Sequence, residues 1–303
     1  MNVMKWLLDS DPAIRWQVMR DLTDEDEGVV TAERSRVANE GWGARLLDSQ
    51  SPRGQWGAGK DRGWLSTVHN LTLLKDLGAD PEARKVRRAI DRVRKHVTWY
   101  QLDGRPYFDG ETEPCINGRI LATGAYFGEP SNRLLRRLLR EQLQDGGWNC
   151  EAPKSKCSSF HTTICVLEGL LEYEKAHGRS AAVTKARVRA QGYLLERQMF
   201  RSLRTGEVVD RSWTRFAFPP SYHYDVLRGL DYLRSAGVKP DLRVAEAIEV
   251  VNERRHQNGL WPLNRVDPRR FTFDMEPGVG KRSHWNTLRA LRVLKWHSNA
   301  RTT

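Results

Sequence analysis

The sequence predicts an all-α fold in which residues 1–303 form one domain, a toroid of paired helices of the (α/α)6 type. Apolar residues recur at helical spacing along the chain, and the period-2 alternation that marks strands is nearly absent. Segments of inner and outer helical type alternate with a period of roughly 45–60 residues, as in helical-repeat proteins. These two observations favour a closed ring of helix pairs.

The inner helices are predicted from their first residues. Serine, a good N-cap residue, opens three of them at Ser159, Ser221 and Ser283. Asp11 caps an earlier one, and Gly78 ends another. The six inner helices are expected at residues 11–22, 66–77, 115–127, 159–171, 221–234 and 283–296.

The outer helices are predicted to carry much of the positive charge. They are expected at residues 31–38, 81–101, 131–143, 180–200 and 241–257. Two of them have arginines interleaved with apolar residues, which indicates amphipathic helices with a solvated basic face. The net charge of +12 is also compatible with nucleic acid, an anionic membrane surface or an anionic ligand, but we do not expect nucleic acid to be the partner.

The chain is expected to be cytoplasmic, with reduced thiols. Its first ten residues lack the apolar core of a signal peptide, and no apolar run is long enough to span a membrane. In a reducing compartment, thiols serve more often as metal ligands or packed side chains than in disulfides. The four cysteines are Cys115, Cys150, Cys157 and Cys165.

The 11 tryptophans suggest a repeated packing position, an aromatic cavity, or both. Glycine lies near tryptophan in several loops, and we expect packing roles for Trp56, Trp148 and Trp261. Trp16 and Trp285 are expected to line a cavity, with Trp64 and Trp213 as further candidates.

In a ring, the N-termini of the inner helices would face one mouth of a central cavity. Their partial positive charge favours an anion by about 0.3–1 kcal/mol each. Arg15 is expected to hold the anionic group. Substrate contacts are expected from the side chains at or near the first turns, namely Arg15, Trp16, Asn117, Tyr222 and Trp285.

His223 and Asp225 are the predicted catalytic pair. Histidine is the usual general base near neutral pH, and Asp225 is a neighbouring acid. The alternative interpretation is a structural hydrogen-bond network around a helix start.

The turn Asp145-Gly146-Gly147-Trp148, with Gln142 and Gln144 before it, resembles the repeat signature of the squalene cyclase and protein prenyltransferase β-subunit superfamily. That family is built as an (α/α)6 barrel. The Asp-x-Asp-Asp motif with which class II terpene cyclases protonate their substrates is not found in this sequence.

The prenyltransferase branch is similar at two places. Phe160-His161-Thr162, followed by Leu167-Glu168-Gly169-Leu170, looks like that family's histidine motif, and Glu113-Pro114-Cys115 looks like its Asp-x-Cys motif. The resemblance implies a zinc ion held by Glu113, Cys115 and His161. Cys150 and His223 are alternative ligands. Arg105 is the only match to the family's diphosphate-binding residues, and the partner α-subunit is not part of this chain.

Together these observations predict a zinc enzyme of the terpenoid cyclase or prenyltransferase type that acts on an apolar or isoprenoid-like small molecule. The first alternative is a metal-free cyclase or isomerase that uses an unfamiliar acid such as Asp225. The second is a non-catalytic binding protein with a basic helical-repeat surface.

Overall fold

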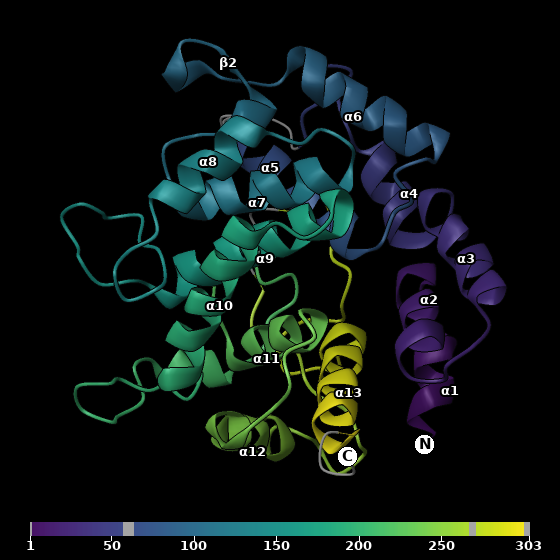
Figure 1. Cartoon of the computed structure of the whole chain (residues 1–303). Helices are drawn as coiled ribbons and strands as arrows, with labels where there is room; N and C mark the ends of the chain where they lie inside the picture. Colours follow the sequence, from purple (N-terminus) through teal and green to yellow (C-terminus); the bar gives the residue numbers. More distant parts are fainter. Residues whose placement is uncertain (1, 57–63, 267–270, 300–303) are drawn as a thin grey trace. The chain divides into compact units, whose positions relative to one another are not determined.

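The computed structural model describes residues 2–56, 64–266 and 271–299 (Figure 1). The chain divides into two compact units. The terminal unit comprises residues 1–34, 192–267 and 274–303, and the middle unit comprises residues 35–191 and 268–273.

The middle unit contains most of the longer helices. In chain order its elements are η1 (Arg36–Ala38), α4 (Gly41–Asp48), α5 (Trp64–Asp76), α6 (Arg84–His96), η2 (Tyr100–Leu102), η3 (Tyr107–Asp109), α7 (Pro114–Tyr126), α8 (Asn132–Arg140), α9 (Phe160–His177) and most of α10 (Ala181–Glu196). A two-stranded antiparallel sheet pairs β1 (Thr98–Trp99) with β2 (Arg105–Pro106).

The terminal unit joins the two ends of the chain. It contains α1 (Val3–Leu8), α2 (Pro12–Asp21), nearly all of α3 (Glu27–Ser35), η4 (Arg211–Thr214), α11 (Val226–Ser235), η5 (Leu242–Val244), α12 (Ala245–Glu253) and α13 (His284–Asn299). No helix in the described part of the chain is both long and apolar enough to cross a membrane.

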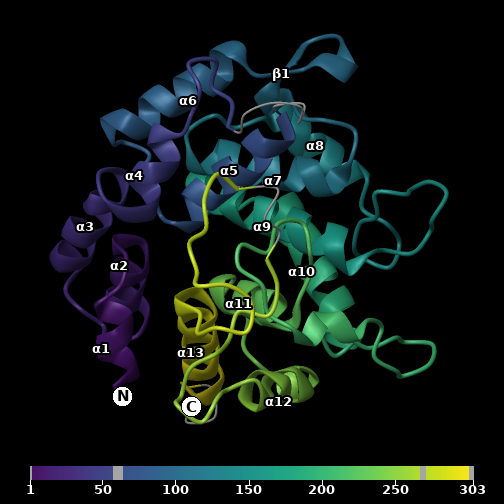
Figure 2. The ribbon, with the colours of Figure 1, turned by 180° about the vertical axis from the view of Figure 1, so that it is seen from behind.

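The buried helices of each unit pack beside one another. In the middle unit α7 packs on both α5 and α9, and in the terminal unit α13 packs on both α11 and α2 (Figures 1 and 2). A helix that is buried on nearly every side belongs in a core, and α7 and α9 are of this type. These six helices are the predicted inner ones, so the all-α class of paired helices is confirmed.

The basic helices bury a single stripe. Helix α8 buries Leu134, Leu135 and Leu138 and exposes Arg133, Arg136 and Arg140. Helix α6 does the same with Val86, Ala89, Ile90 and Val93. The predicted amphipathic character of both helices is confirmed.

The three loop tryptophans share one hydrogen bond. The indole N–H of Trp56, Trp148 and Trp261 donates to the carbonyl oxygen of the residue ten positions earlier, at 2.7 Å in each case. Each ring is at most 1% exposed. Their predicted role in repeat packing is confirmed, because the bond ties each loop to the end of the preceding helix.

Some predicted boundaries were wrong. Helix α11 begins at Val226 rather than at Ser221, because Ser221 has a positive φ of 56° and cannot act as an extended N-cap, whereas Asp225 does. Helix α6 ends at His96, before the small sheet, and α1 was not predicted at all. His223 therefore lies before its helix and is not the counterpart of His161.

Candidate metal centre

Three metal-binding side chains converge where α7 begins. The carboxylate of Glu113 and the sulfurs of Cys115 and Cys150 all lie within 4.8 Å of one another. Glu113 is exposed, and the two cysteines are half-buried and not in disulfides. Two of these residues belong to the predicted zinc set, and Cys150 is one of the two alternative ligands; the other, His223, is not in this cluster of described residues.

The loop before α7 is held rigidly, and this fixes Glu113. The amide of Asn117 accepts from the backbone N–H of Glu111 at 2.7 Å and donates to its carbonyl at 2.9 Å. The Glu111 carboxylate accepts the backbone N–H of Glu113 at 2.6 Å. Asn117 is fully buried and its side chain orders this loop; its contact with a substrate stays a prediction.

Helix α8 clamps the same loop from outside. Arg137 donates to the carbonyl oxygens of Glu111 and Thr112, the latter at 2.7 Å, and pairs with Glu141 at 2.7 Å. Pro114 stands in the first turn of α7, where its missing N–H costs nothing. The backbone that carries Glu113 and Cys115 is thus determined by contacts on two sides.

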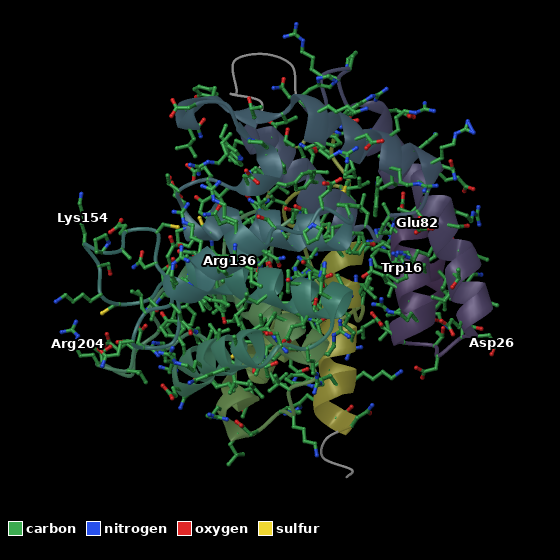
Figure 3. All side chains as sticks on the ribbon, turned by 45° about the horizontal axis from the view of Figure 1, so that its top comes forward. Trp16, Asp26, Glu82, Arg136, Lys154 and Arg204 are labelled. Carbon is green, nitrogen blue, oxygen red and sulfur yellow. The ribbon has the colours of Figure 1, made fainter. Side chains whose placement is uncertain are left out.

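Cys150 is positioned by the turn before α9. Trp148 accepts from the N–H of Ser159 at 2.8 Å, and its own N–H donates to Thr163 Oγ1 at 3.1 Å. The Cys150 sulfur then lies 3.3 Å from Thr162 Oγ1. The following loop, which carries Lys154, projects away from the helices (Figure 3).

Glycines let α7 and α9 approach closely. A Cβ on Gly118 would lie 2.5 Å from the carbonyl oxygen of Cys165, and a Cβ on Gly169 would overlap the carbonyl oxygen of Gly118. Gly169 belongs to the motif that follows His161. The close contact brings the beginnings of the two helices, and with them Cys115 and Cys150, to one place.

The two cysteines differ in acidity. The pKa of Cys150 is lowered because the Cys115 thiol, and secondly the Thr162 hydroxyl, donate hydrogen bonds to its sulfur. The pKa of Cys115 is raised by that same hydrogen bond, by burial and by nearby negative charge including Glu113. Glu113 Oε2, at 3.5 Å from Cys115 Sγ, is a competing acceptor for the same thiol proton. Cys150 is therefore the sulfur that ionises first.

The donor set fits zinc. Zinc binds thiolate and carboxylate ligands at about 2.0–2.3 Å, so neighbouring ligand atoms on a tetrahedral ion lie roughly 3.5 Å apart. The observed cluster requires only small side-chain movements to reach that spacing. His161, the second residue of α9, is half-buried and is not a member of the cluster found among the described residues. Ligation by His161 stays a prediction.

Asp225 occupies a buried structural position in the terminal unit. One carboxylate oxygen accepts the N–H of Arg228 at 2.7 Å, the other accepts the N–H of Ala217 at 3.3 Å, and Arg289 lies 3.9 Å away. Burial raises the pKa of Asp225, although Arg289 opposes the shift. None of these contacts involves His223.

The remaining predicted residues of the terminal unit already have partners. His223 stacks on Tyr222 with ring centroids 4.0 Å apart. Arg15 pairs with Glu33 at 2.6 Å, the Trp16 ring lies beneath the guanidinium of Arg20, and Trp285 stacks on Phe218 at 4.1 Å. Trp16 and Trp285 are 7% and 1% exposed. Their substrate-binding roles stay predictions, and the side chain of Trp64 lies outside the described residues.

No family model matches the sequence, and no curated protein matches it. Solved structures of type II terpene cyclases are similar to this chain. The cyclase MstE from Scytonema, in its apo form, is 18% identical with a TM-score of 0.48, covering 97% of this chain and 89% of MstE. A variant of MstE with its substrate, geranylgeranyl dihydroxybenzoate, is 18% identical with a TM-score of 0.47, covering 95% and 87%. A variant with its product, merosterolic acid A, is 16% identical with a TM-score of 0.46, covering 99% and 98%.

Proposed function

We propose that this chain is a zinc enzyme that acts on an apolar or isoprenoid-like small molecule, with the metal held by Glu113, Cys115 and Cys150. The observation that supports the proposal most directly is the convergence of these three donors within 4.8 Å. Three protein ligands that leave a position for water or substrate are typical of catalytic zinc sites.

The surrounding residues suit such a site. Zinc would supply a Lewis acid and a positive charge at the start of α7. The pKa of Cys150 is lowered because Cys115, and secondly Thr162, donate hydrogen bonds to its sulfur, and this favours the thiolate that zinc binds. Glu113 is the exposed member of the three, so the cluster can be reached from solvent on its side. The loop of Glu111 to Glu113, held by Asn117 and Arg137, keeps the ligands in place before the ion binds.

Metal analysis tests the first half of the proposal. We expect about one equivalent of zinc in protein purified without chelators. Cys150→Ser and Cys115→Ser should each lower the zinc content several-fold, because each removes one of the three ligands that would bind the ion. The matched control is Cys157→Ser, which removes an exposed cysteine outside the cluster. Zinc below about a tenth of an equivalent in the wild type would contradict the proposal.

Product analysis tests the second half. The purified zinc-loaded protein is incubated with geranylgeranyl diphosphate, with and without an aromatic acid, and with geranylgeranyl dihydroxybenzoate, and the products are identified by mass spectrometry. We expect conversion that is lost in Cys150→Ser and retained in Cys157→Ser. Conversion that persists in the metal-free protein would instead favour the metal-free cyclase or isomerase.

A further inference from the structure

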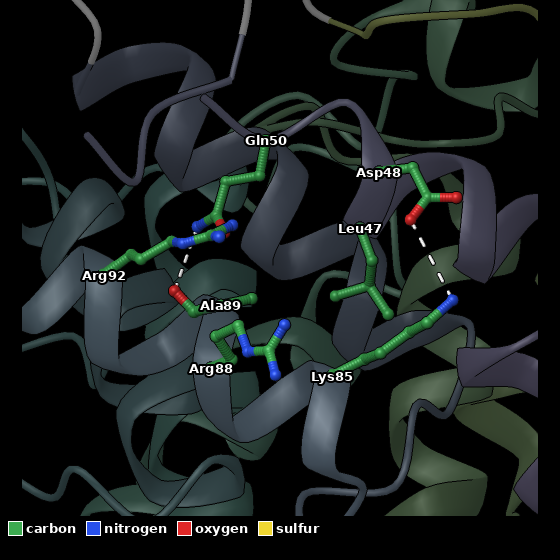
Figure 4. Close-up of a pocket in the computed structure, with 7 residues that line it drawn as sticks. All are labelled: Leu47, Asp48, Gln50, Lys85, Arg88, Ala89 and Arg92. Atoms are coloured by element: carbon green, nitrogen blue, oxygen red, sulfur yellow. Dashed lines mark hydrogen bonds and ion pairs between the residues drawn. The ribbon is translucent and has the colours of Figure 1, made fainter. Parts of the chain in front are cut away.

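A pocket separate from the metal centre lies between the end of α4 and one face of α6. Its volume is about 330 Å³, near the lower end of the range for small-molecule sites. It is lined by Leu47, Asp48, Gln50, Lys85, Arg88, Ala89 and Arg92 (Figure 4). None of these residues belongs to the Glu113–Cys115–Cys150 cluster.

The pocket is strongly positive. Lys85, Arg88 and Arg92 follow one another at helical spacing on α6, so they share one face of that helix. Asp48 is the one acidic residue in the lining, so three cations and one carboxylate leave a net charge of +2. The partial negative charge at the carboxyl end of α4 opposes an anion only weakly, and three nearby cations outweigh it.

The protein leaves these cations largely uncompensated. Arg88 forms no ion pair or hydrogen bond with any described residue, and Lys85 approaches Asp48 only to 4.0 Å, with both side chains exposed. Two other arginines of α6 differ: Arg87 pairs with Glu82 at 3.6 Å, and Arg94 pairs with Asp91 at 2.6 Å. The face of α6 that lines the pocket therefore keeps most of its positive charge, because the acidic residues on and next to this helix pair with arginines outside the pocket.

The floor of the pocket is rigid. Gln50 is 7% exposed, and its amide nitrogen donates to the carbonyl oxygens of Gly54 at 3.1 Å and Ala89 at 2.9 Å (Figure 4). Its amide oxygen accepts a long hydrogen bond, 3.5 Å, from Arg92. This bond orients Arg92 and leaves most of its donors for a ligand.

The chain contains the same arrangement a second time, in a closed form. Gln142 bonds to Gly146 and Ala186 as Gln50 bonds to Gly54 and Ala89. There Arg189, the counterpart of Arg92, donates to the Gln142 amide oxygen at 2.9 Å and to two backbone carbonyl oxygens, of Leu143 at 3.2 Å and Gln144 at 3.1 Å. Arg189 therefore donates its hydrogen bonds to the protein itself, whereas Arg92 has one long hydrogen bond and faces a pocket.

We propose that this pocket binds a phosphate-bearing anion, through Lys85, Arg88 and Arg92. Guanidinium groups bind phosphate oxygens with paired, charge-assisted hydrogen bonds, and lysine adds a compact point charge. A diphosphate or a phosphomonoester with two negative charges matches the net charge of the lining. The phosphate group can belong to a soluble molecule or to a lipid headgroup.

Binding of inorganic diphosphate to the full chain, measured by calorimetry, tests the proposal. Arg88→Ala is the decisive variant, because Arg88 is exposed and forms no ion pair or hydrogen bond with a described residue. We expect it to raise the Kd for diphosphate about tenfold or more. The matched control is Arg136→Ala on α8, which removes an exposed arginine outside the pocket and should leave the Kd unchanged (Figure 3).

Two results would overturn the proposal. One is no measurable binding of diphosphate by the wild type. The other is equal weakening by Arg88→Ala and Arg136→Ala, which would mean diffuse attraction to a chain of net charge +12.

A second arm separates the two sources of phosphate. Vesicles of phosphatidylcholine with one tenth phosphatidic acid are compared with pure phosphatidylcholine in a sedimentation assay. Phosphatidic acid binding that Arg88→Ala abolishes supports the pocket with a lipid headgroup as the source. Diphosphate binding that depends on Arg88, without vesicle binding, supports it with a soluble phosphate compound as the source.

Discussion

A Cβ atom on Gly118 of α7 would lie 2.5 Å from the carbonyl oxygen of Cys165 in α9, so the two helices touch backbone to backbone at this point. Both Gly118 and Gly169 face this contact, and neither can take a side chain without moving a helix. The start of α7 provides Glu113 and Cys115, and the turn before α9 provides Cys150. The position of the metal centre therefore depends on a contact between two glycines deep in the middle unit.

We expect Gly118→Ala to destabilise the protein by about 1–3 kcal/mol, because the added methyl group forces the helices apart. The midpoint temperature of thermal unfolding and the zinc content should both fall. Gly192→Ala is the control: Gly192 lies within α10, and a Cβ there would meet only Glu196 Oε1 at 3.9 Å, so alanine should leave stability unchanged or raise it by up to about 1 kcal/mol. A fully stable Gly118→Ala protein would show that the helices do not pack this closely.

We expect Thr162→Val to raise the pKa of Cys150, because the Thr162 hydroxyl no longer donates to its sulfur. The measurement is the rate of alkylation by iodoacetamide against pH, in metal-free protein that carries Cys157→Ser. In that background the midpoint for Cys150 should lie below the value of about 8.5 that is usual for a thiol, and Thr162→Val should move it upward. A midpoint that does not move would mean that this hydrogen bond is absent in solution.

We expect Asp231→Asn to cost about 3–5 kcal/mol, because it removes the main carboxylate partner of the buried Arg292, whose remaining carboxylate, Asp21, lies 3.4 Å away. Burial alone would raise the pKa of Asp231, but Arg292 and Arg234 hold it well below the usual range. The folded state thus favours the ionised carboxylate. The stability that results is complete above a pH of about 4 and is lost as the pH falls below that value.

The control for Asp231 is Asp241→Asn. The Asp241–Arg243 pair is exposed, and exposed pairs contribute about 0–1 kcal/mol. Urea unfolding from pH 7 to pH 3 should show a steep loss of stability on acidification in the wild type and a shallower one in Asp231→Asn. Equal slopes would contradict the assigned ion pair.

We expect Asp225→Asn to fold and to keep its activity, because asparagine is also a good N-cap and the metal centre lies elsewhere in the chain. Burial raises the pKa of Asp225, so the folded state favours the proton. The wild type should lose this part of its stability as the pH rises above about 4, and the variant should not. A stable but inactive Asp225→Asn protein would identify Asp225 as the catalytic acid.

Helix positions were predictable where one cap residue stood alone. Ser159 caps α9 and Ser283 caps the first turn of α13, as serine at those positions indicated. Before α11, Ser221 and Asp225 are both of residue types that cap helices. The loop holds Ser221 at positive φ, so the N-cap is Asp225 and the helix begins at Val226. The local sequence does not show which of two possible N-cap residues a loop will hold at positive φ.

The proximity of metal-binding residues was predictable within one sequence motif, but not between two motifs far apart in the chain. Glu113 and Cys115 are two residues apart at a helix start, so their proximity follows from the sequence. Whether Cys150 or His161 joins them depends on how α9 lies against α7, which is set by Gly118 and Gly169. The phosphate pocket was missed for the same reason, since α6 and α8 look alike as basic helices until α4 is placed beside one of them.

The hydrogen bonds of Trp148 and Trp261 allow the loop after each tryptophan to vary in length. The indole N–H of Trp148 and Trp261 ties each ring to the helix before it, and the backbone N–H of each donates to a threonine of the helix that follows, Thr163 and Thr287. The stretch in between runs over residues 149–159 in one repeat and 262–283 in the other. Because both ends of the stretch are anchored, doubling its length costs only about 0.6 kcal/mol. New loops can therefore be acquired, or a peptide inserted next to Lys154, without disturbing the helices on either side.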